Sequence, residues 1–151
     1  MNPVTEDPSI ERSIEIKRVF NAPRQLVWNA WTQPELIAEW WSPNGMHAPL
    51  DSVTCELRVG GAFSVKMIMD EDGTEHDVDA KFESLDEPNQ LVLVNAQPGD
   101  PFKFVVTLDE LGDDKTELTL FCIGDATAQE VAEMDQGWSE MFDKQDRLLA
   151  Q

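Results

Sequence analysis

The sequence is short of basic residues. Lys and Arg number 11 against 30 Asp and Glu, which gives a formal net charge of −19. DNA and RNA are therefore poor partners, because phosphate binding needs a basic face, and an anionic membrane surface is disfavoured for the same reason. The acid excess indicates either solubility through mutual repulsion or a saline habitat in which salt screens that repulsion. We favour the first interpretation.

Long apolar runs and cysteines are scarce as well. No stretch of about 18 apolar residues is present, so no membrane-spanning helix is predicted. Residues 1–13 are polar and contain no apolar signal core, which favours a cytoplasmic protein. Cys55 and Cys122 stand alone in apolar runs without the spacing of metal ligands, so we expect free buried thiols, no metal and no cofactor.

The N-terminal third predicts a tail, a strand and two short helices. Residues 1–12 are expected to be a frayed tail, and residues 13–151 a single domain. Alternating apolar positions predict a strand over 13–21. Pro23 marks a helix start, and Pro34 ends that helix and begins a second one, which stops near Trp40 and Trp41.

In the middle of the chain, apolar residues recur at every second position. Gly60-Gly61 marks a sharp bend, and Asp70 to Gly73 a hairpin turn. Six further strands are predicted, over residues 52–58, 62–69, 75–85, 90–95, 102–109 and 115–122. Strands joined by turns, with no helices between them, predict an antiparallel sheet.

The last segment is predicted to be one long helix. Thr127 and Glu130 form a capping-box pattern at its start. An apolar stripe then follows at helical spacing: Val131, Met134, Trp138, Met141, Phe142, Leu148 and Leu149. The fold class is therefore α+β: a curved antiparallel sheet of about seven strands that needs the long helix to cover one face.

Several motifs resemble one family in the order in which they occur. They are Phe20-Asn21-Ala22-Pro23-Arg24, Val27-Trp28, Ala30-Trp31-Thr32, Pro34-Glu35, Trp40 to Gly45, Arg58 to Gly61 with Phe63, Asp72-Gly73, Leu91-Val92 and Gly137-Trp138. Together they resemble bacterial proteins similar to the C-terminal domain of the activator of the ninety-kilodalton heat-shock protein (Hsp) ATPase. Ser42 and Ala80 stand where that family usually has glycine.

The resemblance covers about residues 14–149 and implies the helix-grip fold of the START/SRPBCC, birch-pollen-allergen-like superfamily. Members of this superfamily share a cavity between sheet and helix but do not share one function. The resemblance alone suggests a chaperone as a protein partner.

A cavity between the sheet and the long helix is the candidate site. Met67 and Met69 on the strands could face Met134 and Met141 on the helix, although ordinary core packing explains them equally well. Adjacent Trp40 and Trp41 cannot both point inward on a helix, so one should face the cavity mouth. The predicted lining is Trp31, Trp40, Trp41, His47, Met67, Met69, His76, Phe104, Trp138, Met141 and Phe142.

Three functions remain open. The leading hypothesis is a non-enzymatic binding module for a small apolar or amphipathic molecule, in a monomer or weak homodimer. The second is a protein that interacts with a chaperone in a stress response. The third is a cyclase- or hydrolase-like enzyme that uses the cavity, although no serine or cysteine lies in a nucleophile-elbow pattern and we name no catalytic residue.

Overall fold

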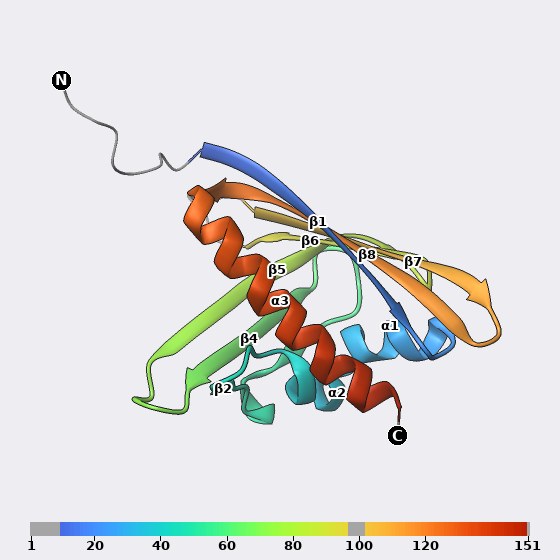
Figure 1. The fold of residues 1–151 in the computed structure, drawn as a ribbon, viewed down its shortest axis with the longest axis horizontal. Helices are drawn as coiled ribbons and strands as arrows, with labels where there is room; N and C mark the ends of the chain where they lie inside the picture. Colours follow the sequence, from blue (N-terminus) through green and yellow to red (C-terminus); the bar gives the residue numbers. More distant parts are fainter. Residues whose placement is uncertain (1–9, 97–101, 151) are drawn as a thin grey trace.

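The computed structural model describes residues 10–96 and 102–150. Its N-terminal elements are β1 (Ile10–Phe20), α1 (Arg24–Thr32), α2 (Pro34–Trp40), β2 (Met46–His47), the 3-10 helix η1 (Leu50–Ser52) and β3 (Thr54–Cys55). The longer strands β4 (Ala62–Met69), β5 (Glu75–Asp86), β6 (Gln90–Asn95), β7 (Phe102–Gly112) and β8 (Lys115–Ala126) follow, and helix α3 (Ala128–Leu149) comes last (Figure 1).

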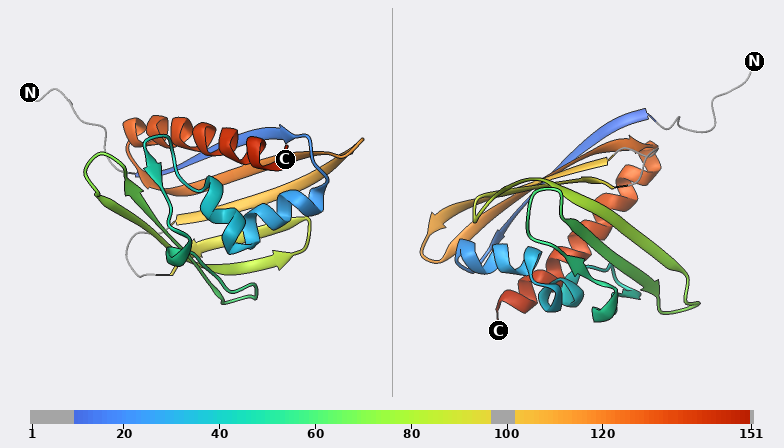
Figure 2. Two further views of the ribbon diagram at one scale, coloured as in Figure 1. Left: turned by 90° about the horizontal axis from the view of Figure 1, so that it is seen from below. Right: turned by 180° about the vertical axis from the view of Figure 1, so that it is seen from behind.

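The strands form one antiparallel sheet in the order β1-β8-β7-β6-β5-β4-β2, with β3 also paired to β4. The sheet is curved, and all three α-helices lie on its concave side (Figure 2). This arrangement confirms the predicted α+β architecture with two short helices after the first strand. The described residues form eight strands rather than about seven, because two-residue β2 pairs with the end of β4 inside a segment predicted as loop.

Several boundaries differ from the prediction. Strand β1 begins at Ile10, inside the range predicted as a tail, because its pairing with β8 runs from Phe20 back to Ile10; the rest of that tail, residues 1–9, lies outside the described residues. The same pairing extends β8 to Ala126. The strand predicted over 52–58 is reduced to β3, because Arg58 N–H donates to Glu56 O and the chain turns there.

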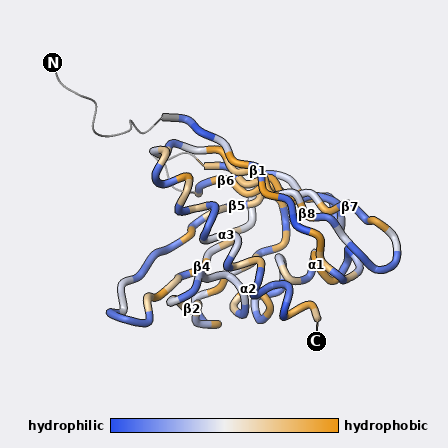
Figure 3. The backbone as a smooth tube through the Cα atoms, in the orientation of Figure 1, coloured by the Kyte–Doolittle hydropathy of each residue, from blue (hydrophilic) through white to orange (hydrophobic). Residues whose placement is uncertain are grey.

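An aromatic cluster fills the space between the helices and the sheet. The ring centroid of Trp31 lies 4.7 Å from that of Trp40, 5.5 Å from that of Trp41 and 6.1 Å from that of Trp138. Phe142 packs against the same rings. Apolar residues gather in the central part of the sheet, whereas the β4–β5 turn is hydrophilic (Figure 3).

The expectation that Trp40 and Trp41 cannot both point inward is wrong, although Trp41 also borders the groove described below. Their exposed fractions are 0% and 1%. Trp41 caps α2 with φ −82° and ψ 61°, which is not helical backbone, so the rotation between adjacent helical residues does not apply to it. Trp40 is held in the core by its indole N–H, which donates to Ala30 O over 2.8 Å.

Helix α3 begins with the predicted capping box: Thr127 accepts from the Glu130 N–H, and the Glu130 carboxylate accepts from the Thr127 N–H. Its C-terminal half is tied to the loop after α2. Lys144 Nζ donates to Ser42 O over 2.7 Å and to Pro43 O over 3.3 Å. These bonds fix the segment that carries Trp41 and Pro43 against the helix.

Candidate functional site

A groove of about 430 Å³ runs along the N-terminal half of α3, on the side that faces the sheet. We call it the main groove. Its walls come from the loop after α2, from four strands and from α3: Trp41, Pro43, Met67, Val78, Phe104, Asp125, Ala126, Glu130, Glu133, Met134, Gly137, Trp138 and Met141. Apart from the three carboxylates, its side chains are apolar. The groove lies between α3 and the strands of the sheet.

The groove exists because packing is uneven along α3. Trp138, Met141, Phe142 and Gln145 are buried, whereas Val131 and Met134, nearer the start of the helix, are only half-buried. The aromatic cluster fills the space beside the later turns, whereas Phe104 and Met134, nearer the first turns, are only partly buried.

Gly137 widens the same groove. A Cβ at this position would have only Pro43 Cγ, at 3.7 Å, within 4 Å. Helical backbone does not require a glycine, and glycine in a helix interior costs about 1 kcal/mol relative to alanine. The absent side chain therefore leaves open volume in the groove at some cost in helix stability.

Three aromatic rings form one wall of the groove. The Trp138 ring lies between the other two, with centroids 5.4 Å from Trp41 at 82° and 5.7 Å from Phe104 at 90°. Edge-to-face packing of this kind holds the rings in fixed orientations. Trp41 and Trp138 are almost completely buried, so Phe104 is the most exposed of the three rings.

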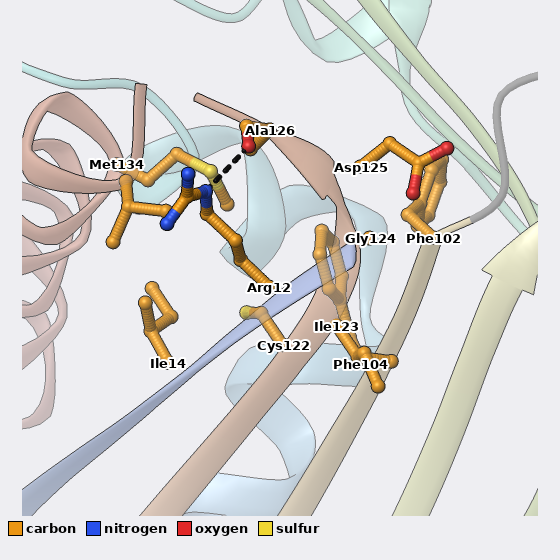
Figure 4. Close-up of a pocket in the computed structure, with 11 residues that line it drawn as sticks. Arg12, Ile14, Phe102, Phe104, Cys122, Ile123, Gly124, Asp125, Ala126 and Met134 are labelled. Atoms are coloured by element: carbon orange, nitrogen blue, oxygen red, sulfur yellow. Dashed lines mark hydrogen bonds between the residues drawn. The ribbon is translucent and has the colours of Figure 1, made fainter. Parts of the chain in front are cut away.

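A side chamber of about 200 Å³ continues the main groove toward β1 and shares Phe104, Asp125, Ala126 and Met134 with it. Figure 4 shows Arg12 reaching from β1 to the edge of this chamber, where its Nε donates to Ala126 O over 2.7 Å. Burial raises the pKa of the Cys122 thiol in the chamber wall to about 12, so it is protonated and weakly nucleophilic at neutral pH.

A separate polar groove of about 510 Å³ lies near the C-terminal end of α3. Lys144 and Arg147 line it together with His47, whose Nδ1 is 2.6 Å from Asp70 Oδ1. The pKa of Lys144 is lowered mainly by burial, and repulsion from Arg147 lowers it further. Lys144 already donates to Ser42 and Pro43, which gives it a structural task in the loop after α2.

The structure brings together five of the eleven residues predicted to line the cavity. They are Trp41, Met67, Phe104, Trp138 and Met141. Trp31, Trp40 and Phe142 are instead completely buried in the aromatic core and line none of the described grooves. Their large rings are needed there to fill the gap between the short helices and α3.

The other three predicted residues lie elsewhere. His47 lines the polar groove. Met69 is half-buried and pairs with Met46 of β2. His76 shares the sheet face of its partner Met67 but is exposed, because the β4–β5 hairpin extends past the helices there (Figure 1).

The predicted lining lacked several residues that the main groove contains. Met134, which the sequence placed across the cavity from the strand methionines, does line the groove. The same side of α3 also carries Glu130, Glu133 and Gly137, which follow one another at spacings of three and four. The prediction considered only apolar residues on this helix and therefore did not include them. Pro43 and Val78 gave no comparable signal, since their position depends on the loop and strand packing.

The described residues contain no group of three or more His, Cys, Asp or Glu side chains placed to hold a metal ion. The main groove is lined by apolar side chains, aromatic rings and carboxylates. In the described part of the chain, no helix is both long and apolar enough to cross a bilayer.

Solved structures of bacterial proteins share this fold. A Chromobacterium violaceum protein is 20% identical with a TM-score of 0.81, over 91% of this chain and 96% of the other. A Nitrosomonas europaea protein is 23% identical with a TM-score of 0.77, over 91% and 94%. A Silicibacter pomeroyi protein is 16% identical with a TM-score of 0.78, over 92% and 98%.

No curated protein sequence matches this chain. The family model described as activator of Hsp90 ATPase homolog 1-like protein matches residues 21–150. This span includes both short helices, the strands from β2 to β8 and all of α3. The chain therefore belongs to the family of activator of Hsp90 ATPase homolog 1-like proteins.

Proposed function

We propose that this protein binds a small apolar or amphipathic molecule in the main groove. One observation carries the proposal: about 430 Å³ of open space between the sheet and α3 is walled by Trp41, Phe104 and Trp138. Ligand sites typically have volumes of about 300–1,000 Å³, mostly apolar walls and a few polar groups. The main groove has each of these properties.

Titration with Nile red, a neutral dye whose fluorescence rises in apolar surroundings, tests the proposal. The native protein should bind the dye saturably. Gly137→Leu should weaken that binding by about tenfold or more, because the new side chain occupies the groove. Ala132→Leu is the matched control, since Ala132 is an exposed position of the same helix that does not line the groove.

Two results would contradict the proposal. One is the absence of dye binding to the native protein. The other is equal dye binding by the native protein and a folded Gly137→Leu variant. Mass spectrometry of the natively purified protein complements the titration, because a co-purified small molecule would identify the ligand class directly.

A second candidate function is contact with a chaperone, which the family match favours. Leu57 and Val59, in the β3–β4 connection, are 46% and 66% exposed and lie outside the main groove. Exposed apolar side chains are candidate contacts for a protein partner. If this function holds, the protein should stimulate the ATPase of a bacterial ninety-kilodalton heat-shock protein, and the double variant Leu57→Ser/Val59→Ser should not.

A further inference from the structure

The charged side chains around the main groove are all of one sign. Asp125, Glu130 and Glu133 line it, and among the described residues no Lys, Arg or His does. The adjoining side chamber adds Arg12. The combined formal charge of the two spaces is therefore 1 − 3 = −2, inside a protein whose net charge is −19.

The three carboxylates are not neutralised by ion pairs with the described residues. Within the described residues, none of them has an ion-pair partner. Glu133 Oε2 accepts from the neutral amide of Gln129 over 3.3 Å. Glu130 Oε1 accepts from the Thr127 N–H in the capping box. Asp125 is exposed at the end of β8.

The aromatic wall is compatible with a cationic ligand, and Phe104 is its most exposed ring. The face of an aromatic ring carries negative quadrupolar potential, so a cation near Trp, Phe or Tyr is attracted to it. Trp41, Phe104 and Trp138 line the groove that the carboxylates border. An anionic ligand such as a fatty acid would meet repulsion from the carboxylates.

We propose that the ligand of the main groove is an apolar cation: an amine or quaternary ammonium group attached to an apolar body. This inference rests on the proposed binding function and narrows its ligand class. The apolar body packs against Trp138, Met67 and Met141, and the ammonium group lies toward the carboxylates. The lining of the side chamber contains both Arg12 and Asp125 and has no net formal charge, so a cation is attracted less strongly there than to the main groove.

Three probes with one ring system and different charges test this inference. Naphthylmethylammonium is cationic, naphthalenemethanol is neutral and naphthoate is anionic. Isothermal titration of the full chain at low salt should give affinities in that order. The cation should bind about tenfold or more tightly than the anion, and added salt should reduce the difference, because exposed charges are screened.

Glu133→Gln removes one carboxylate and preserves side-chain shape and helix propensity. It should weaken binding of the cation by about threefold and leave binding of the neutral alcohol unchanged. Asp135→Asn is the control, since Asp135 is exposed on the same helix and does not line the main groove. This variant should bind all three probes as the native protein does.

The outcomes separate the two proposals. If none of the probes binds, the binding function and its ligand class both fail. If the alcohol binds but naphthoate binds as tightly as the ammonium probe, the binding function stands and the cationic ligand class is refuted. Equal weakening of the cation and the alcohol by Glu133→Gln also refutes it, because the effect would then be on groove shape.

Discussion

Replacing Gln145 with methionine should stabilise the protein. Gln145 lies on the buried face of α3 with Trp138, Met141 and Phe142, and its exposed fraction is 0%. Neither its amide nitrogen nor its amide oxygen has a hydrogen-bond partner among the described residues. The amide is therefore buried without a hydrogen bond to any described protein group.

The magnitude follows from that loss. A buried polar group without a partner costs about 1–3 kcal/mol. Methionine has nearly the length and helix propensity of glutamine, so Gln145→Met changes packing little and removes the unpaired amide. We expect the free energy of unfolding to rise by about 1–3 kcal/mol, and Tm by roughly 2–4 °C for each kcal/mol in a chain of this size.

Urea unfolding and thermal melting, both followed by tryptophan fluorescence, measure the effect. Gln136→Met is the matched control: Gln136 is exposed on the same helix, and its amide donates to Glu140 over 3.2 Å. The control should change stability by less than about 0.5 kcal/mol. A Gln145→Met variant less stable than the native protein would refute the reasoning, because the amide would then have to be satisfied in the folded state.

Three further predictions concern stability. Trp138→Ala should lower the free energy of unfolding by about 3–5 kcal/mol, because it removes the central ring of the aromatic wall; a loss no larger than that of Ser139→Ala in urea unfolding would contradict this. Added salt should raise Tm, since screening weakens the repulsion within a chain of net charge −19; a lowered midpoint in a salt series would show that the carboxylates are not collectively repulsive. Burial raises the pKa of Cys55 to about 11 and that of Cys122 to about 12, against an ordinary value of 9.0. The native state thus keeps protons that the unfolded chain loses, so stability should fall as pH rises above about 9, and less steeply in Cys122→Ala.

The sequence predicts the architecture well because the main elements carry strong local signals. Strand β4 and strand β6 have the predicted bounds, and the capping box fixes the start of α3. These features depend on alternation, turn residues and capping, which neighbouring residues determine.

The errors occur where distant contacts decide the structure. Two-residue β2 exists because Met46 and His47 pair with Met69 and Ile68 of β4. Trp41 turns inward because the chain leaves helical geometry at the end of α2. Strand β2 has no signal within a few residues of sequence, and the predicted end of the second helix near Trp40 and Trp41 did not specify where the Trp41 ring would point.

The candidate site was less predictable than the fold for the same reason. Side-chain type alone suggested that Trp31, Trp40 and Phe142 line a cavity, but packing among the helices places them in the core. Gly137 contributes open space because it has no side chain, and Glu133 contributes a charge. A search for large apolar residues selects neither of them.

The pairing of β1 with β8 has a consequence for biosynthesis. Ile10 pairs with Ala126, so partners in one ladder are 126 − 10 = 116 positions apart in the chain. At about 5–20 residues per second, the ribosome adds Ala126 roughly 6–23 seconds after Ile10. During that interval β1 has no strand to pair with, and its alternating charged residues, including Glu11, Glu15 and Lys17, oppose pairing with strands of other chains. Pairing of β1 with the whole of β8 is possible only after residue 126 has been synthesised, when most of the matched family region is complete.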